Sequence, residues 1–246
     1  MNLLEALGRD SGVICLVGAG GKKTCMYHLA ASHPGRVLLT STAHMYPYRE
    51  NKIDRLIAWE EAGADFKLSD EERVIALASK TDTPKRIGGI EADDLALTLD
   101  KQAFDLCVIK GDGARARWIK APAEHEPLIP SVTDVVVPVV SIKSIGRPLD
   151  DRTAHRPEQI AKLVGHRPGD LITSTAVSRL LSHPNGALKG VGDYEVVPLL
   201  NMADNGRLTS LARKVATNAL AATDRFSRVL VASMKQDEVK EVVSLN

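Results

Sequence analysis

The chain has 246 residues, of which 44% are hydrophobic and 26% are charged. This apolar fraction is typical of a globular fold with a sizeable core and excludes a disordered or collagen-like chain. The 32 Lys and Arg residues nearly balance the 31 Asp and Glu residues, and only 4% of the residues are aromatic. Charge and composition therefore give no reason to expect a nucleic-acid partner, bound either by a basic surface or by base stacking.

Three isolated cysteines, Cys15, Cys25 and Cys107, form neither a disulfide framework nor a zinc-binding pattern. They fit a reducing compartment. The first ten residues lack the basic and apolar segments of a signal peptide, and the longest apolar run, 135–140, is too short to span a bilayer. We therefore expect a cytoplasmic protein without a membrane partner.

Short apolar runs alternate with segments of helical spacing along the chain, except over residues 51–73, which show no clear pattern. Strands are expected at 12–17, 36–41, 105–109, 134–140, 194–200 and 228–232, with further candidates at 74–78 and 86–90. Helices are expected at 22–31, 91–104, 156–164 and 206–222. Buried strands alternating with helices are typical of a parallel sheet covered on both faces. The sequence thus predicts one α/β domain, residues 1–246, with an open, mostly parallel sheet and a fold like that of P-loop NTPases.

A glycine-rich turn, residues 18–21, joins the first expected strand to the first helix. Its backbone N–H groups and the helix N-terminus suit phosphate oxygens, and Lys22 or Lys23 would add a full positive charge. The P-loop pattern G-x-x-x-x-G-K-[ST] is not satisfied in either register, and the dinucleotide pattern fails because Lys23 replaces its third glycine. We expect this turn to bind phosphate; the alternative is a plain strand-to-helix connection. The candidate residues are Gly18, Gly20, Gly21, Lys22, Lys23 and Thr24.

Two further groups of polar residues follow the strand at 105–109. Asp112 lies just past that strand, after Lys110 and Gly111, where a carboxylate can hold Mg²⁺ beside bound phosphates; the alternative is a simple turn. The proline-stiffened segment 120–130 contains Lys120, Glu124 and Glu126. In extended backbone the two glutamates would point to the same side. We expect this segment to face the same cleft as the glycine-rich turn; the alternative is a solvated surface loop.

The turn after the strand at 194–200 reads Asn201-Met202-Ala203-Asp204. In many GTPases an Asn-Lys-x-Asp turn at this place reads guanine, because the Asp carboxylate accepts hydrogen bonds from the base. Asn201 and Asp204 are therefore candidates for base recognition, although Met202 replaces the lysine. The alternative is a structural turn beside a helix cap.

Taken in order, these segments resemble the YqeC family, whose members are described as accessory factors of selenium-dependent molybdenum hydroxylases. The resemblance runs from about residue 12 to 204, and the segment 120–130 is its most specific part. It rests on Gly-Ala-Gly-Gly-Lys, Thr-Ser-Thr-Ala-His, Asp-Gly-Ala, Lys-Ala-Pro-Ala-Glu-His-Glu-Pro-Leu-Ile-Pro and Asn-x-x-Asp.

The resemblance implies a maturation factor that binds GTP or ATP with Mg²⁺ and serves a molybdenum hydroxylase or its cofactor-processing proteins. The site residues that it implies fall into three groups. Catalytic roles go to Lys22, Asp112, Glu124 and Glu126; metal binding to Thr24 and Asp112; and cofactor contacts, besides the glycine-rich turn, to Thr42, His44, Lys120, Asn201 and Asp204.

The chain departs from the family pattern at three positions: Lys23 stands where Thr is usual, Lys110 where Glu is usual, and Met202 where Lys is usual. An added lysine near phosphates neutralises their charge but repels Mg²⁺. Three functions therefore remain open. These are a nucleotide-hydrolysing maturation factor, a non-hydrolysing module for a nucleotide or molybdopterin dinucleotide, and a nucleotide- or phosphoryl-transfer enzyme.

Overall fold

A computed structural model of the protein describes residues 1–245. The strands are β1 (Gly12–Gly18), β2 (Val37–Ser41), β3 (Arg55–Ala58), β4 (Val74–Ala78), β5 (Leu106–Lys110), β6 (Ile119–Lys120), β7 (Val135–Ser141), β8 (Ala154–His155), β9 (Glu195–Val196), β10 (Leu199–Asn201), β11 (Arg228–Ser233) and β12 (Glu238–Ser244). The α-helices are α1 (Leu3–Leu7), α2 (Lys22–Ser32), α3 (Trp59–Ala62), α4 (Ala92–Lys101), α5 (Pro157–Val164), α6 (Ser174–Ser182) and α7 (Gly206–Leu220).

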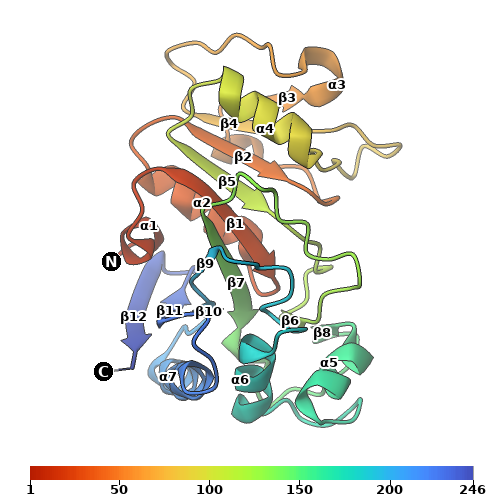
Figure 1. The fold of residues 1–246 in the computed structure, drawn as a ribbon, viewed down its shortest axis with the longest axis vertical. Coiled ribbons are helices and arrows are strands. Elements are labelled where there is room, and N and C mark those ends of the chain that lie inside the picture. The colour runs from red at the N-terminus through yellow and green to blue at the C-terminus, as the bar shows by residue number, and fades with distance from the viewer. Residues whose placement is uncertain (246) are drawn as a thin grey trace.

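Ten of the strands form one sheet, in the order β12-β11-β10-β7-β1-β5-β2-β4-β3, with β9 also paired to β7. The pairings of this sheet are parallel except for the antiparallel pair β11 and β12. Figure 1 shows the sheet running from β3 at the top, through β1, to β12 at the lower left. Because the strands are parallel, the carboxyl ends of β1, β2, β5, β7 and β10 lie at one edge, where polar segments follow them.

Both faces of the sheet are covered, as the continuous apolar strands predict. In β1, Ile14 and Leu16 belong to a core shared with α1 and α2, whereas Cys15 and Val17 belong to a second core shared with α4, α6 and α7. Successive side chains of a strand point to opposite faces, so a wholly buried strand serves both cores. The predicted fold class, an α/β protein with an open, mostly parallel sheet and helices on both faces, is confirmed.

Some predicted elements differ in the structure. The single strand expected at 194–200 is divided into β9 and β10 around Pro198, which has no N–H to donate to a ladder. Residues 86–90 make only isolated bridges, and β12 follows what the sequence indicated as the last strand. None of the helices in residues 1–245 is both long enough and apolar enough to cross a bilayer.

Candidate functional site

A cleft of about 630 Å³ lies at the carboxyl edge of the sheet, beside the glycine-rich turn. Ligands of open α/β sheets bind in crevices of this kind. Its lining is strongly cationic: within residues 1–245, seven Lys or Arg side chains line it together with one carboxylate. The cations are Lys22, Lys23, Arg86, Lys110, Arg115, Arg117 and Arg156, the carboxylate is Glu126, and His44 and His155 complete the titratable lining.

The glycine-rich turn packs closely against β7 and Asn201. Gly20 and Gly21 have φ values of 111° and 113°, a conformation that other residues rarely adopt. A Cβ atom on Gly18 would lie 2.5 Å from the carbonyl oxygen of Val139, and one on Gly21 would lie 2.7 Å from the amide nitrogen of Asn201. Packing alone therefore requires glycines here, so the glycine cluster by itself does not distinguish a phosphate site from a structural turn.

The start of α2 offers the cleft backbone N–H groups. Gly21 is the N-cap residue and supplies no side-chain acceptor, and it lines the cleft together with Gly20, Lys22 and Lys23. The first N–H groups of a helix have no partner within the helix, and the helix dipole favours negative charge there. An anion in the cleft can be held at this point.

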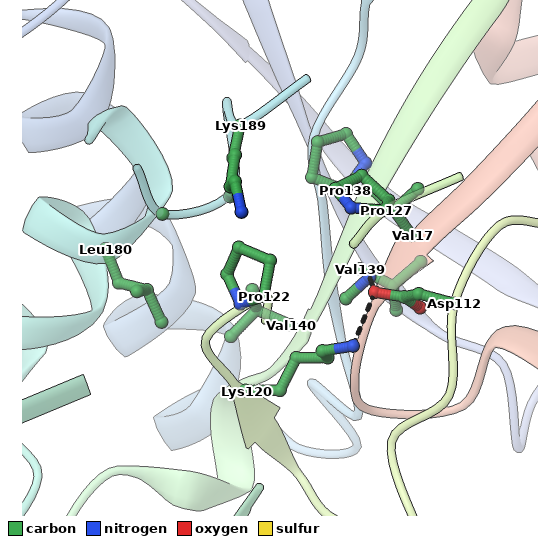
Figure 2. A pocket seen from close by; sticks show the side chains of 13 residues that line it. Val17, Asp112, Lys120, Pro122, Pro127, Pro138, Val139, Val140, Leu180 and Lys189 are labelled. Carbon is green, nitrogen blue, oxygen red and sulfur yellow. Dashed lines mark hydrogen bonds and ion pairs between the residues drawn. The ribbon is translucent and has the colours of Figure 1, made fainter. Parts of the chain in front are cut away.

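Five side chains of alternating charge run beside the cleft, and we refer to them as the charged row: Lys22, Asp112, Lys120, Glu126 and Arg156. The Nζ atom of Lys22 lies 2.8 Å from Oδ1 of Asp112, and that of Lys120 lies 2.9 Å from Oδ2. Lys120 also lies 2.8 Å from Oε2 of Glu126, which is 2.7 Å from Arg156. Figure 2 shows Asp112 and Lys120 turned toward each other.

The charged row is largely buried. Lys22, Asp112 and Lys120 are 5%, 2% and 5% exposed. Burial alone would raise the pKa of Glu126, but the hydrogen bond and charge of Lys120, with the hydrogen bonds from Ala123 and Arg156, lower this pKa to about 2. Burial lowers the pKa of Lys22 although Asp112 opposes it. Ion pairs within the row, with hydrogen bonds from the N–H groups of Gly18 and Ala123, therefore hold these buried charges.

A second, much smaller cavity of about 20 Å³ lies behind Asp112 and Lys120 (Figure 2). Pro122, Pro127 and Pro138 line it. It has room for about one water molecule, so it is too small to hold a nucleotide.

Lys110, at the end of β5, is the most unusual cation of the cleft. Its side chain is only 9% exposed, and its Nζ atom has no hydrogen-bond partner among the described residues. Burial, together with the charge of Lys22, lowers the pKa of Lys110 to about 7, against the opposing effect of Asp112. A buried donor without a partner costs free energy, and an anion in the cleft would supply acceptors for it.

The residues present do not fit Mg²⁺. Both oxygens of Asp112 lie within 2.9 Å of a lysine amine, and the charge of Asp112 also acts on the amine of Lys110. Thr24 is exposed on α2 and does not line the cleft. Within residues 1–245, no group of three or more His, Cys, Asp or Glu side chains is placed to hold a metal ion.

The amine of Lys23 is engaged by the segment that follows β2. Its Nζ atom donates to the carbonyl oxygens of Tyr46, at 2.9 Å, and of Pro47. It lies 5.9 Å and 5.4 Å from the ring centres of Tyr27 and Tyr48. The side chain thus ties α2 to the segment that follows β2, although its stem still lines the cleft.

The segment 120–130 faces the same cleft as Gly20 and Lys22, as the sequence predicts, because Glu126 lines it. Its two glutamates, however, do not share a face. The N–H of Glu126 donates to the carbonyl oxygen of Ala123 at 3.1 Å, so the chain turns here instead of continuing extended. Glu126 joins the charged row, whereas Glu124 is exposed, and its carbonyl oxygen accepts from Lys189 at 2.7 Å.

Asn201 and Asp204 form structural contacts. The amide of Asn201 donates to the carbonyl oxygen of Gly20 at 2.7 Å. One carboxylate oxygen of Asp204 accepts from Ser233 at 2.6 Å, and the other lies 2.6 Å from Nζ of Lys143. Neither residue lines the cleft. Both groups that were expected to read a base are thus occupied by neighbours.

Of the two cofactor-contacting residues expected after β2, one lines the cleft and the other does not. His44 is exposed and lines the cleft, whereas Thr42 donates to the carbonyl oxygen of Leu128 at 2.9 Å and does not line it. Lys110, Arg86, Arg115 and Arg117 also line the cleft, and the sequence motifs did not predict them. Lys110 departs from the family pattern, which has Glu at this place, whereas the arginines lie in irregular segments without a sequence signal.

Residues 14–158 match the model of the YqeC protein family. This range is more than half of the chain, and it contains the glycine-rich turn and the whole charged row. The chain belongs to the YqeC family. It is also 28% identical over 183 residues to "Uncharacterized protein YqeC" of Escherichia coli (strain K12), a match that covers 73% of this chain and 71% of the relative. The resemblance predicted from the motifs is confirmed, although the family match ends before Asn201.

Proposed function

We propose that this protein binds a nucleoside triphosphate, GTP or ATP, in the cationic cleft and acts as an accessory factor in the maturation of molybdenum hydroxylases. The observation that carries the binding proposal is the excess of seven Lys and Arg side chains over one carboxylate around the helix start of α2. The proposed client, a molybdenum hydroxylase or its cofactor-processing proteins, is the one that the resemblance to the YqeC family implies.

The cleft suits a polyphosphate for a physical reason. Several like charges around one cavity repel one another, and a ligand with several negative charges relieves this repulsion. The helix start and the Lys110 amine offer hydrogen-bond donors, and the neighbouring cleft residues His44 and Tyr46 offer rings beside them. A charged tail with an aromatic base matches this combination of groups.

A second candidate, a module that binds a nucleotide or molybdopterin dinucleotide without hydrolysing it, is favoured by the state of Asp112. This carboxylate is held between Lys22 and Lys120, with its Oδ2 atom also accepting from the N–H of Gly18 at 2.9 Å. A carboxylate so engaged is poorly placed to activate a water molecule. Product analysis separates the candidates. A hydrolysing factor releases nucleoside diphosphate and phosphate, and a non-hydrolysing module releases neither. A nucleotide- or phosphoryl-transfer enzyme would release other products.

The test is a thermal-shift panel of GTP, ATP, CTP and molybdopterin dinucleotide, each with and without Mg²⁺. A ligand at 100 times its Kd stabilises the folded state by about 2.7 kcal/mol, which is easily detected. Lys22→Ala should reduce the shift for every triphosphate alike, because phosphates do not report the base. Lys101→Ala, an exposed position on α4 paired with Asp65, is the matched control. No shift with any ligand, or an unchanged shift in Lys22→Ala, would remove the support for this site.

We propose a cytoplasmic location for this activity. Cys15, Cys25 and Cys107 are free and buried in the structure, which fits a reducing compartment.

The client is testable separately. Deleting the protein should leave a molybdenum hydroxylase of the same cell synthesised but inactive, and the wild-type chain, but not Lys22→Ala, should restore its activity.

A further inference from the structure

We propose that lysine amines hold the phosphates of the ligand in place of a divalent cation, with Lys110 supplying the decisive positive charge. This inference rests on the proposed function for the presence of a phosphate ligand. It goes beyond that function by specifying the ionic form in which the ligand binds, a triphosphate or diphosphate free of Mg²⁺.

The first support is the placement of Lys110. A buried ammonium or amine normally has a hydrogen-bond partner, because leaving it without one costs free energy. Lys110 is nine-tenths buried, lines the cleft, and has no partner for its Nζ atom among the described residues. An acceptor-rich anion is the ligand that completes this environment.

The second support is the state of Asp112, the carboxylate best placed to hold a cation. Its Oδ1 atom lies 2.8 Å from Nζ of Lys22, and its Oδ2 atom lies 2.9 Å from Nζ of Lys120. A divalent cation there would have to displace at least one amine and would still meet the other at close range. Two buried ammonium groups therefore already neutralise the charge that would attract a metal.

The third support comes from α2. A hydroxyl that follows the phosphate-binding lysine is a usual Mg²⁺ ligand at such helix starts. Here Lys23 follows Lys22 and is held by the carbonyl oxygens of Tyr46 and Pro47, while the hydroxyl of Thr24 belongs to an exposed residue that does not line the cleft. Neither residue provides the oxygen ligands that Mg²⁺ prefers.

The groups that surround Lys110 set the charge that the ligand meets. Lys22 from α2 and Lys120 from β6 are positive, whereas Asp112 and Glu126 are negative. With Lys110 charged, this cluster has more positive than negative members. Complexation by Mg²⁺ lowers the negative charge of a triphosphate, so excess Mg²⁺ should compete with the protein for the ligand.

The experiment measures the Kd of ATP, GTP and inorganic pyrophosphate by calorimetry, in excess EDTA and in excess Mg²⁺. We expect binding in EDTA to be as tight as in Mg²⁺ or tighter. Lys110→Met should weaken binding in EDTA by about tenfold or more, as expected for a lost charge-assisted hydrogen bond. Lys101→Met removes the same charge from exposed α4 and should leave the Kd unchanged.

The outcomes are distinguishable. Binding that requires Mg²⁺, or a Kd in EDTA that is the same for Lys110→Met and the wild type, overturns this inference while the proposed nucleotide site stands. Absence of binding in both EDTA and Mg²⁺ overturns the proposed function and this inference with it. A melting curve of Lys110→Met without ligand shows that the variant is folded, so that lost binding reports the cleft.

Discussion

The side-chain amide of Asn201 donates a hydrogen bond to the carbonyl oxygen of Gly20 at 2.7 Å. This bond joins the last residue of β10 to the glycine-rich turn that follows β1, although the two residues lie 181 positions apart in the sequence. The amide oxygen of Asn201 also accepts from the N–H groups of Met202, at 2.6 Å, and Met234, at 3.0 Å. One buried side chain therefore fixes the glycine-rich turn relative to the far half of the sheet.

Asn201→Ala should lower the free energy of unfolding by about 2–4 kcal/mol, because it leaves buried backbone groups without partners. Urea denaturation measures this loss. Asn185→Ala, at an exposed position, should change the value by less than about 0.5 kcal/mol. Equal losses in the two variants would show that the Asn201 contacts contribute little to stability.

Glu126→Gln should change the acid stability of the protein. The pKa of Glu126 falls from 4.5 to about 2 in the folded state, so below pH 4.5 the unfolded state binds more protons. Its contribution to stability is present above about pH 4.5 and is lost as the pH falls toward 2. The unfolding free energy of Glu126→Gln should therefore depend less on pH between these limits than that of the wild type.

Glu124→Gln is the matched control for that measurement, because Glu124 is exposed on the same loop. Its pH profile should follow the wild type. If Glu126→Gln also follows the wild type, the ion pairs with Lys120 and Arg156 do not stabilise the fold.

Lys110→Met should make the protein more stable while weakening anion binding. The lysine stem is replaced by an apolar side chain of similar length, and a buried amine without a hydrogen-bond partner is removed. We expect the unfolding free energy of the variant to be higher by about 1–3 kcal/mol at neutral pH, because residues kept for function often lower the stability of the wild type. Chemical denaturation without ligand measures it.

The gain also has a predicted pH dependence. The pKa of Lys110 is about 7 in the folded state and 10.5 in the unfolded chain, so the unfolded state binds more protons between these values. The penalty from Lys110 is complete below pH 7 and disappears toward pH 10.5. The advantage of Lys110→Met should shrink accordingly as the pH rises, and a constant or negative difference would contradict the assignment.

Asp204→Asn separates a base-reading role from a structural one. If Asp204 recognised guanine, the variant would have a lower affinity for GTP and a higher affinity for xanthosine triphosphate, because a hydrogen-bond acceptor becomes a donor. Because Ser233 and Lys143 already occupy both oxygens, we expect equal, small changes in the affinity for ATP and GTP. A selective loss of GTP with a gain of xanthosine triphosphate would restore the base-reading interpretation.

The sequence predicts the sheet well because its central strands are uniformly apolar. β1, β5 and β7 are each bounded by polar or glycine residues and are buried on both faces, so local pattern and tertiary environment agree. β12 was missed because its apolar residues alternate with charged ones at the end of the sheet, Glu238, Lys240 and Glu241 among them. Such an edge strand has a weak local signal.

The candidate site was predicted less completely, because its ion pairs join residues that are distant in the sequence. Lys22, Asp112, Lys120 and Glu126 were all singled out, yet nothing in the sequence showed that they would satisfy one another. The turn at Ala123 also separated Glu124 from Glu126, where the sequence predicted a shared face. Lys110 could be recognised as unusual, but its missing partner is visible only in three dimensions.

The imbalance of charge around the cleft makes the choice of buffer part of any measurement on this protein. Phosphate and sulfate are small multivalent anions, and under the proposed function they would compete for a cleft that has seven cationic side chains and one carboxylate among its described lining. If the cleft binds phosphate as proposed, a sample purified in phosphate should melt at a higher temperature and show a weaker apparent affinity for nucleotides. Differences in melting temperature or nucleotide affinity between samples in different buffers would then reflect the buffer anion as much as the protein.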